Sequence, residues 1–185
     1  LFDRRLLARR RDRAARQFQD YDFLHARAAD DLLDRVESVT RDFDTCLVLG
    51  GGGAIGRALN DRPGARAKIN HLIETDLSAA MAGLSDQTSA CLDEERLPIA
   101  PQSVDLVISC LNLHWTNDIV GALIQINHAL KPDGFFAGAL LGGATLTELR
   151  QSFQKITDED PAPRRVSPFA DTVDMAGLLS RAGFT

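Results

Sequence analysis

Residues 46–59 read "CLVLGGGGAIGRAL", an apolar run that leads into four consecutive glycines and then into an alanine-rich segment. The apolar run is typical of a buried strand, and the residues after the glycines are typical of a helix. Glycines at such a junction let another group approach the backbone where a side chain would block it. The stretch therefore predicts the strand–turn–helix unit of a nucleotide-binding α/β fold.

Two ligand fingerprints fit the four glycines. The G-x-G-x-x-G of a dinucleotide site begins at Gly51, whereas the G-x-G-x-G/A of an S-adenosylmethionine site begins at Gly50 and includes Gly52. Both sites need an acid at the end of the second strand, where its carboxylate accepts hydrogen bonds from the ribose hydroxyls. Asp76 is our candidate for this acid and Glu74 is the alternative. The glycine run alone does not choose between the two ligands.

Short apolar runs alternate with segments of helical spacing along the rest of the chain. This alternation predicts an α/β, Rossmann-like fold with one mostly parallel sheet and helices on both faces. A chain of 185 residues, of which 44% are apolar, suits one buried core rather than two. The predicted strands are residues 46–49, 69–74, 90–92, 104–111 and 135–141.

The N-terminal segment has a different pattern. Residues 4–38 show helical spacing and predict one broken helix or two. We therefore divide the chain into an N-terminal helical lid or extension, residues 1–40, and an α/β domain, residues 41–185. The chain stops at "GFT", where a further strand should begin, so we expect this domain to be incomplete at its C-terminal end.

Several boundaries follow from capping and turn residues. A helix over residues 119–130 should end at "KPDG", whose proline and glycine form a turn into the next strand. A capping box from Thr145 to Glu148 should begin another helix. Residues 158–169 are the predicted long loop, and a helix over residues 171–182 should end at Gly183.

Charge is divided unevenly along the chain. The first sixteen residues contain seven arginines and two aspartates, a net charge of +5, whereas the whole chain has a net charge of −5. A basic arm can contact nucleic acid or anionic lipid, but it also fits a helix with a solvated arginine face, which we favour. We expect no nucleic-acid partner and do not predict contact with a membrane surface.

The three cysteines, Cys46, Cys91 and Cys110, lie in strand-like apolar runs without metal-ligand spacing. They are predicted to be buried thiols, which suits a reducing compartment. The chain contains no apolar run of the roughly 20 residues that a membrane-spanning helix needs. We expect a cytoplasmic protein if it is bacterial, and a mitochondrial matrix protein if it is eukaryotic.

Residues 91–115, "CLDEERLPIAPQSVDLVISCLNLHW", carry motifs that separate the two cofactors. Asp93 follows the third predicted strand, where a carboxylate can accept from an adenine amino group. Together with the glycine run, the chain has five motifs in the order G-x-G, D-x-S-x-x-M, D-x-E-x-L-P, D-L-V-x-S and L-K-P-D-G. In this order of motifs, which covers about residues 45–141, the chain resembles class I S-adenosylmethionine-dependent methyltransferases. The resemblance makes residues 41–185 a methyltransferase-like α/β domain. It implies S-adenosyl-L-methionine as cofactor, bound by Gly50, Gly52, Asp76, Asp93 and Ser109.

A closer resemblance extends over nearly the whole chain. The segments "LFDRRLLARRRDRAA", "LHWTNDIVGALIQINHALKPDG", "LLGGATLTELRQSF" and "RVSPFAD" are similar to the respiratory complex I assembly-factor branch of this superfamily. The biotin-pathway methyltransferases of malonyl carrier protein are more distant relatives. The resemblance implies a complex I subunit or a carrier protein as partner. The assembly-factor branch also implies arginine hydroxylation of a complex I subunit as an alternative to methyl transfer.

His114 and Trp115 follow the fourth predicted strand, where members of the superfamily line the methyl-acceptor pocket. We therefore assign both to the substrate pocket, and the tryptophan ring could contact a cation. In the alternative interpretation, Trp115 packs beneath the next helix and Asp118 is the N-cap of that helix.

The remaining candidates are weaker. His25 and Arg27 could reach the donor carboxylate from a lid helix, although an exposed helix face suits them better, and His71 and His128 are interpreted as structural. Each of the four histidines is followed two residues later by Arg, Ile, Thr or Leu, so the H-x-D/E pair of an iron site does not occur. We predict no metal.

One position departs from the superfamily pattern. An acid for the donor's ammonium usually stands two residues before the first loop glycine, and here that position is Val48. Alternation along the strand predicts that Val48 faces the donor's methionine end. Methyl transfer needs positioning more than acid–base chemistry, so we assign no catalytic residue. The sequence supports a methyltransferase acting on a protein partner, a small-molecule or carrier-protein methyltransferase, or a non-catalytic assembly module or hydroxylase on the same fold.

Overall fold

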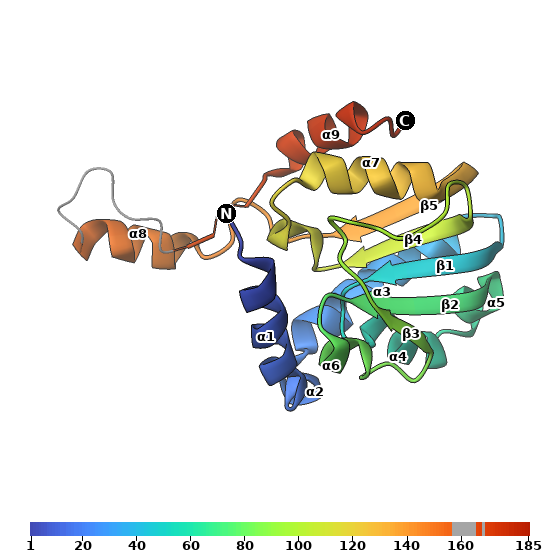
Figure 1. The fold of residues 1–185 in the computed structure, drawn as a ribbon, viewed down its shortest axis with the longest axis horizontal. Helices are drawn as coiled ribbons and strands as arrows, with labels where there is room; N and C mark the ends of the chain where they lie inside the picture. The colour runs from blue at the N-terminus through green and yellow to red at the C-terminus, as the bar shows by residue number, and fades with distance from the viewer. Residues whose placement is uncertain (157–165, 168) are drawn as a thin grey trace.

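A five-stranded sheet forms the centre of the molecule in a computed structural model that describes residues 1–156, 166–167 and 169–185 (Figure 1). The strand order is β3–β2–β1–β4–β5, and all neighbouring strands are parallel. The carboxyl ends of the strands therefore meet at one edge, and the order reverses between β1 and β4, where ligands bind in folds of this type. The strands are β1 Phe43–Leu49, β2 Ile69–Asp76, β3 Thr88–Cys91, β4 Val104–Cys110 and β5 Leu130–Ala139.

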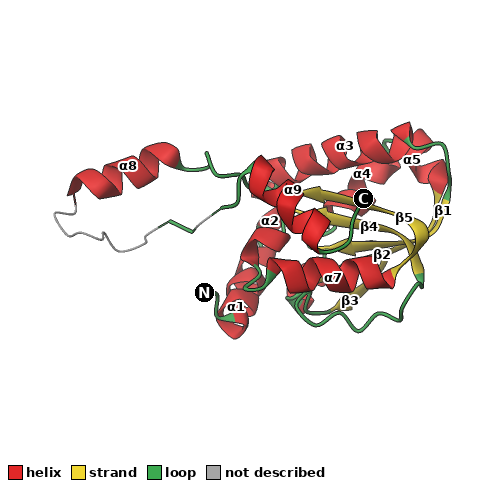
Figure 2. Ribbon diagram, turned by 90° about the horizontal axis from the view of Figure 1, so that it is seen from above, coloured by secondary structure: helices red, strands yellow, loops and turns green. Residues whose placement is uncertain are grey.

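Helices cover both faces of this sheet, as the fold prediction required (Figure 2). One face packs against α3, α4 and α5, and the other packs against α7 and α9. Along β1, Cys46 and Val48 face the first layer while Leu47 and Leu49 face the second. The helices of the described residues are α1 Arg4–Ala15, α2 Phe18–Tyr21, α3 Phe23–Ser38, α4 Ala54–Asn60, α5 Pro63–Lys68, α6 Ala79–Ala82, the short 3-10 helix η1 Leu113–Trp115, α7 Ile119–Ala129, α8 Thr147–Ile156 and α9 Thr172–Arg181.

The five predicted strands are confirmed, and the differences lie at element ends. The N-terminal segment forms three helices, not one or two. Strand β5 begins at Leu130, and its register with β4 shifts before Phe135, so "KPDG" forms an irregularity inside the strand, with Asp133 at φ 61°. Helix α8 begins at Thr147 after Leu146 at φ 57°, one residue later than a capping box with Thr145 as its N-cap predicts.

The end of α9 follows the prediction. The last helical residue is Arg181, and Gly183 comes two residues later with φ 87°, the left-handed conformation in which glycine commonly ends a helix. The predicted long loop at residues 158–169 lies largely outside the described residues. Helix α3 packs in the same core as α4 and α5, and the division of the chain at residue 40 stays a prediction.

The predicted burial of the cysteines is correct for two of three. Cys46 and Cys110 are buried, but Cys91 is exposed because β3 is the edge strand of the sheet. The sequence pattern did not reveal which strand would be at the edge. His71 and His128 lie on the surface. In the described part of the chain, the helices are too short or too polar to cross a membrane.

A buried acid at the start of β4 ties three strands together. Asp105 accepts a 3.1 Å hydrogen bond from the Thr45 amide and a 2.9 Å hydrogen bond from Lys131 Nζ, and Arg41 Nη2 lies 3.7 Å away. Burial by itself would raise the pKa of Asp105, but the hydrogen bonds from Lys131 and Thr45 and the nearby positive charges lower it. The carboxylate thus joins β4 to β1 and β5 at neutral pH.

Asp105→Asn should lower the free energy of unfolding by about 1–2 kcal/mol at pH 7, because the charge-assisted hydrogen bond from Lys131 is lost. The folded pKa is lower than that of the unfolded chain, so this contribution is present at neutral pH and is lost as the pH falls through the acid range. Urea denaturation at pH 7 and pH 4 measures both effects. Asp44→Asn, at an exposed acid of β1, is the control and should change the stability little; an equal loss in both variants would contradict the role of Asp105.

Candidate functional site

The four glycines after β1 have positive φ angles of 75°, 96°, 55° and 79°. A Cβ added at Gly50 would lie 2.6 Å from Asn112 Cβ, and one added at Gly52 would lie 2.6 Å from the ring of Phe18. Both distances are too short for real atoms. Position 50 therefore requires glycine because Asn112, which follows β4, leaves no room for a side chain there. Position 52 requires glycine because of Phe18 of α2.

A cavity of about 280 Å³ lies at the carboxyl ends of β1, β2 and β4. Gly51, Asp76 and Asn112 line it from the strand ends, and Trp115 lines it from η1. The N-terminal helices supply the other wall, with Leu7, Arg10, Arg11, Ala14, Phe18 and His25. The cavity is therefore at the switch point of the sheet and is roofed by α1.

Asp76 is the acid of this cavity. Its side chain is 3% exposed, and its Oδ1 accepts from the Ser78 amide at 2.9 Å and from Arg11 Nη1 at 3.1 Å. Arg11 Nη2 also donates to Asn112 Oδ1 at 2.7 Å. Arg11 therefore bridges the ends of β2 and β4, on either side of the glycine loop. No hydrogen bond from the described residues reaches Asp76 Oδ2.

Glu74, the alternative to Asp76, has a structural role. It is buried, and its two carboxylate oxygens accept from the Gly56 amide and from the Ser85 hydroxyl. These contacts join β2 to α4 and to the loop before β3. Of the two acids predicted for the ribose, Asp76 is the one on the cavity wall.

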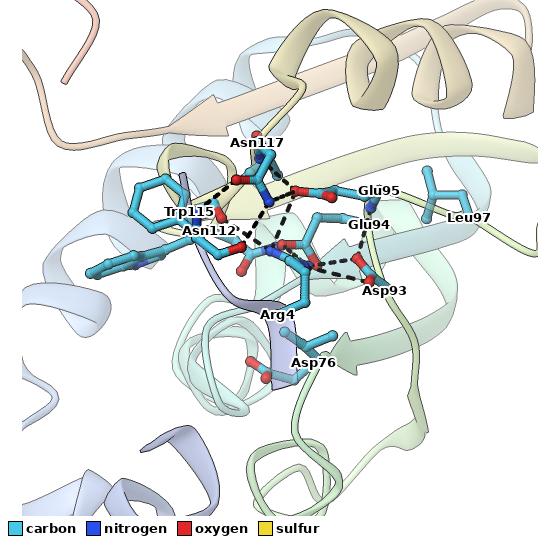
Figure 3. A network of polar contacts seen from close by, with 12 residues as sticks. Arg4, Asp76, Asp93, Glu94, Glu95, Leu97, Asn112, Trp115 and Asn117 are labelled. Atoms are coloured by element: carbon cyan, nitrogen blue, oxygen red, sulfur yellow. Dashed lines mark hydrogen bonds and ion pairs between the residues drawn. The ribbon is translucent and has the colours of Figure 1, made fainter. Parts of the chain in front are cut away.

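Asp93 belongs to an acidic cluster around Arg4 (Figure 3). Arg4 Nη2 lies 2.6 Å from Asp93 Oδ1 and 2.9 Å from Glu94 Oε1, and Arg4 Nη1 donates to the Trp115 carbonyl at 3.1 Å. Burial opposes the charge of Arg4, but the hydrogen bond to Asp93 and the charge of Glu94 outweigh it and raise the pKa of the guanidinium. Asp93 is therefore already paired by α1, and it lies outside the cavity wall.

The arginines of α1 correct the sequence interpretation. Arg5, Arg9, Arg10, Arg13 and Arg16 are exposed, as a solvated face requires, but Arg4 and Arg11 point inward to acids. These two residues are seven apart, two helical turns, so they share a face. This spacing, together with strand-end acids of opposite charge, is the signal that could have identified them.

His114 and Trp115 are neighbours in sequence but line different cavities. Trp115 lines the first cavity, and His114 lines a second one of about 160 Å³ together with Thr116, Ile119 and Met175. His114 Nδ1 is buried and has no hydrogen-bond partner among the described residues. Burial, with the charges of Arg11 and His25, lowers the pKa of His114 to about 4, so the ring is neutral at neutral pH.

Three further candidates have clear positions. Asp118 Oδ1 accepts from the Gly121 amide at 2.8 Å, so Asp118 is the N-cap of α7, as one interpretation proposed. His25 faces the first cavity, and burial lowers its pKa, whereas Arg27 is exposed. His25 is thus part of the cavity wall, contrary to the preferred expectation of an exposed helix face.

Two predicted residues lie inside the core. Ser109 is 0% exposed, and its hydroxyl has no hydrogen-bond partner within the described ranges. Val48 is also 0% exposed and packs in the core layer of α3 and α4, so its side chain does not face the cavity as strand alternation suggested. The alternation along β1 is correct, but the sequence pattern does not show that the layer of α3 closes over Val48.

The residues at the cavity fit the nucleoside end of a donor. A buried carboxylate with one free oxygen can accept from a ribose hydroxyl, and the glycine loop exposes backbone beside it. The Asn112 amide and the Trp115 ring add a polar group and an aromatic face. Across the ranges that the structure describes, groups of three His, Cys, Asp or Glu side chains suited to a metal ion do not occur.

Comparisons with known proteins agree with this geometry. Residues 47–138 match the family model of a methyltransferase domain. The whole chain is 38% identical to the rat arginine-hydroxylase NDUFAF5, mitochondrial, of which it covers 55%, and 32% identical to a malonyl-[acyl-carrier protein] O-methyltransferase of Methylovorus, of which it covers 64%. The chain thus spans only about half to two thirds of the length of these relatives.

Solved structures give the same fold. A complex of the Haloferax volcanii Trm112 methyltransferase activator with a putative methyltransferase matches with a TM-score of 0.71 and 23% identity, over 93% of this chain and 75% of that one. The likeness at this identity concerns the fold alone. From the family match, the relatives and the sheet together, the chain belongs to the methyltransferase domain family and has the Rossmann-like fold of class I methyltransferases.

Proposed function

We propose that this protein binds S-adenosylmethionine in the cavity beneath α1 and acts on a protein partner during assembly of respiratory complex I. The observation that carries the cofactor is the position of Asp76, a buried acid at the end of β2 with one free oxygen beside the glycine loop. The similarity over the whole chain to proteins named NDUFAF5 supports the partner. The protein would then work in the mitochondrial matrix of a eukaryote or in the bacterial cytoplasm.

The chain's own residues would hold the donor by its nucleoside end. Asp76 would accept from the ribose hydroxyls, and the backbone at Gly50–Gly53 would allow the donor to approach because it carries no side chains. When bound, the cofactor supplies a methyl group activated by a positive sulfur. Val48 offers no charge to the donor's ammonium, which must rely on backbone carbonyls or water. Asp93 can reach an adenine amino group only when Arg4 leaves it.

The second cavity suits the acceptor. His114 is neutral there and has a free ring nitrogen, so it can form one hydrogen bond to a partner group without adding charge. Trp115, the next residue along the chain, lines the first cavity. The role we propose for His114 is therefore orientation of the acceptor.

Arginine hydroxylation is the second candidate. It is favoured by identity: the relatives named arginine-hydroxylase are 38% identical over the whole chain, against 32% for the carrier-protein methyltransferase. Val48 at the usual acidic position also weakens the case for tight binding of a cationic donor. A carrier-protein methyltransferase and a non-catalytic assembly module have less support than these two functions.

Capture of the partner distinguishes these functions. The tagged protein should retain a complex I subunit from lysate of the source organism, and mass spectrometry should find one added methyl group on that subunit. One added oxygen would support the hydroxylase. Recovery of acyl carrier protein in its place would support the carrier-protein methyltransferase, and an unmodified subunit would contradict both enzymatic functions.

Asp76→Asn should weaken binding of S-adenosylhomocysteine by roughly 10- to 150-fold, because a charge-assisted hydrogen bond contributes about 1.5–3 kcal/mol. Isothermal titration calorimetry on the folded variant measures this. Asp61→Asn, at an exposed acid after α4, is the matched control and should bind like the parent. Unchanged binding by Asp76→Asn would remove the acid from the donor site.

The neutral state of His114 predicts a pH dependence of stability. The unfolded histidine has a pKa of about 6.5, above the folded value, so the unfolded chain binds the proton first. The contribution is therefore complete above about pH 6.5 and is lost as the pH falls toward 4. Urea denaturation at pH 8, 6 and 5 should show a smaller decrease for His114→Gln than for the parent. His128→Gln, at an exposed residue, should behave like the parent; identical pH profiles for all three proteins would contradict the buried, neutral ring.

A further inference from the structure

We propose that α1 and the nucleoside end of the donor compete for the same carboxylates, so that α1 in this structure is a self-docked helix that must release Asp76 before a donor binds fully. This inference rests on the proposed function, because it concerns the same site. It assigns to Arg11 and Arg4 a role in controlling access that is distinct from surface charge.

The first observation is the position of Arg11. Its guanidinium bridges Asp76 Oδ1 and Asn112 Oδ1, at 3.1 and 2.7 Å, across the ends of the two strands that flank the glycine loop. A ribose presents two hydroxyl groups to its acid, and a carboxylate can accept them with one hydroxyl on each of its two oxygens. With Arg11 and the Ser78 amide on Oδ1, Oδ2 is left for the donor.

The second observation is the pairing of Arg4. Its Nη2 lies 2.6 Å from Asp93 Oδ1 and its Nε lies 3.5 Å from Asp93 Oδ2, so the guanidinium covers both oxygens of the carboxylate. The same Nη2 approaches Glu94, which is 1% exposed. The two acids that the sequence assigns to ribose and adenine are thus each paired with an arginine of one helix. Figure 3 shows the pair of Arg4 and Asp93.

The third observation is that α1 has little apolar anchorage. Of its twelve residues, only Ala15 is buried, and Leu6 is 40% exposed. By contrast, Arg4 and Arg11 are only 16% and 13% exposed in their side chains. Ion pairs with strand-end acids therefore hold much of this helix in place, and such pairs can exchange for other hydrogen-bond donors without loss of core packing.

The size of the cavity agrees with competition. About 280 Å³ is just below the range of roughly 300–1,000 Å³ that is usual for sites of drug-sized ligands. Arg10, Arg11 and Ala14 of α1 form part of its wall. Withdrawal of Arg11 would enlarge the cavity and release the second oxygen of Asp76 in the same movement.

Arg11→Gln tests the competition directly, with S-adenosylhomocysteine as the probe. The variant should bind about tenfold more tightly than the parent, which corresponds to about 1.4 kcal/mol. Arg9→Gln is the matched control, because Arg9 is an exposed arginine of the same helix, and it should bind within about twofold of the parent. Arg11→Lys keeps the charge but lacks the planar fork with which the guanidinium spans Asp76 and Asn112, so its affinity should lie between those of the parent and Arg11→Gln. It also provides a second folded variant.

Hydrogen exchange supplies a readout that does not depend on affinity. Addition of S-adenosylhomocysteine to the parent should speed amide exchange in α1 and leave exchange in α3 unchanged.

The outcomes separate the two proposals. If the parent binds the probe and folded Arg11→Gln binds it equally or more weakly, the competition is wrong while the proposed donor site stands. Slower exchange in α1 on binding would likewise overturn it, because the helix would then close over the donor. If neither the parent nor any folded variant binds S-adenosylhomocysteine or S-adenosylmethionine, the donor site itself fails and the competition fails with it.

Discussion

Negative charge at one edge of the sheet is the constraint on which the arrangement of the site depends. Parallel strands all end at the same edge, so the acid that ends β2, Asp76, and the acids after β3, Asp93–Glu95, are brought to the same side of the molecule. Asp76 and Glu94 are buried, and buried carboxylates need partners. Arg11 and Arg4 provide them from α1. These ion pairs join the basic N-terminal segment to the acidic remainder of the chain.

The fold could be predicted from the sequence because its signals are local. The apolar run before the glycines, the strand-end acid Asp76, the N-cap Asp118 and the helix-ending Gly183 each depend on neighbouring residues, and the structure has them as expected. Alternation does not separate Asp76 from Glu74, because residues two apart share a face. Their positions along the strand do, since Asp76 is the last residue of β2.

The predictions that were wrong concern features that depend on contacts between residues far apart in the sequence. Exposure of Cys91 depends on which strand is at the edge, and burial of Val48 depends on how α3 closes over β1. The pairing of Arg4 with Asp93 joins residues that are 89 apart in sequence. A single sequence identifies such residues as charged or apolar, but their partners follow only from the topology.

The arginine content of α1 has a consequence for how this segment becomes ordered. Arg5, Arg9 and Arg13 follow one another at intervals of four residues, and like charges at this spacing repel along a helix. A helix of twelve residues is also marginal in water by itself. The free energy that makes α1 helical must therefore come largely from its docking against the rest of the molecule, in which the ion pairs with Asp76 and Asp93 take part. For this segment, helix formation and docking occur together in a single cooperative step. A bound ligand would therefore act most strongly on the local opening of α1.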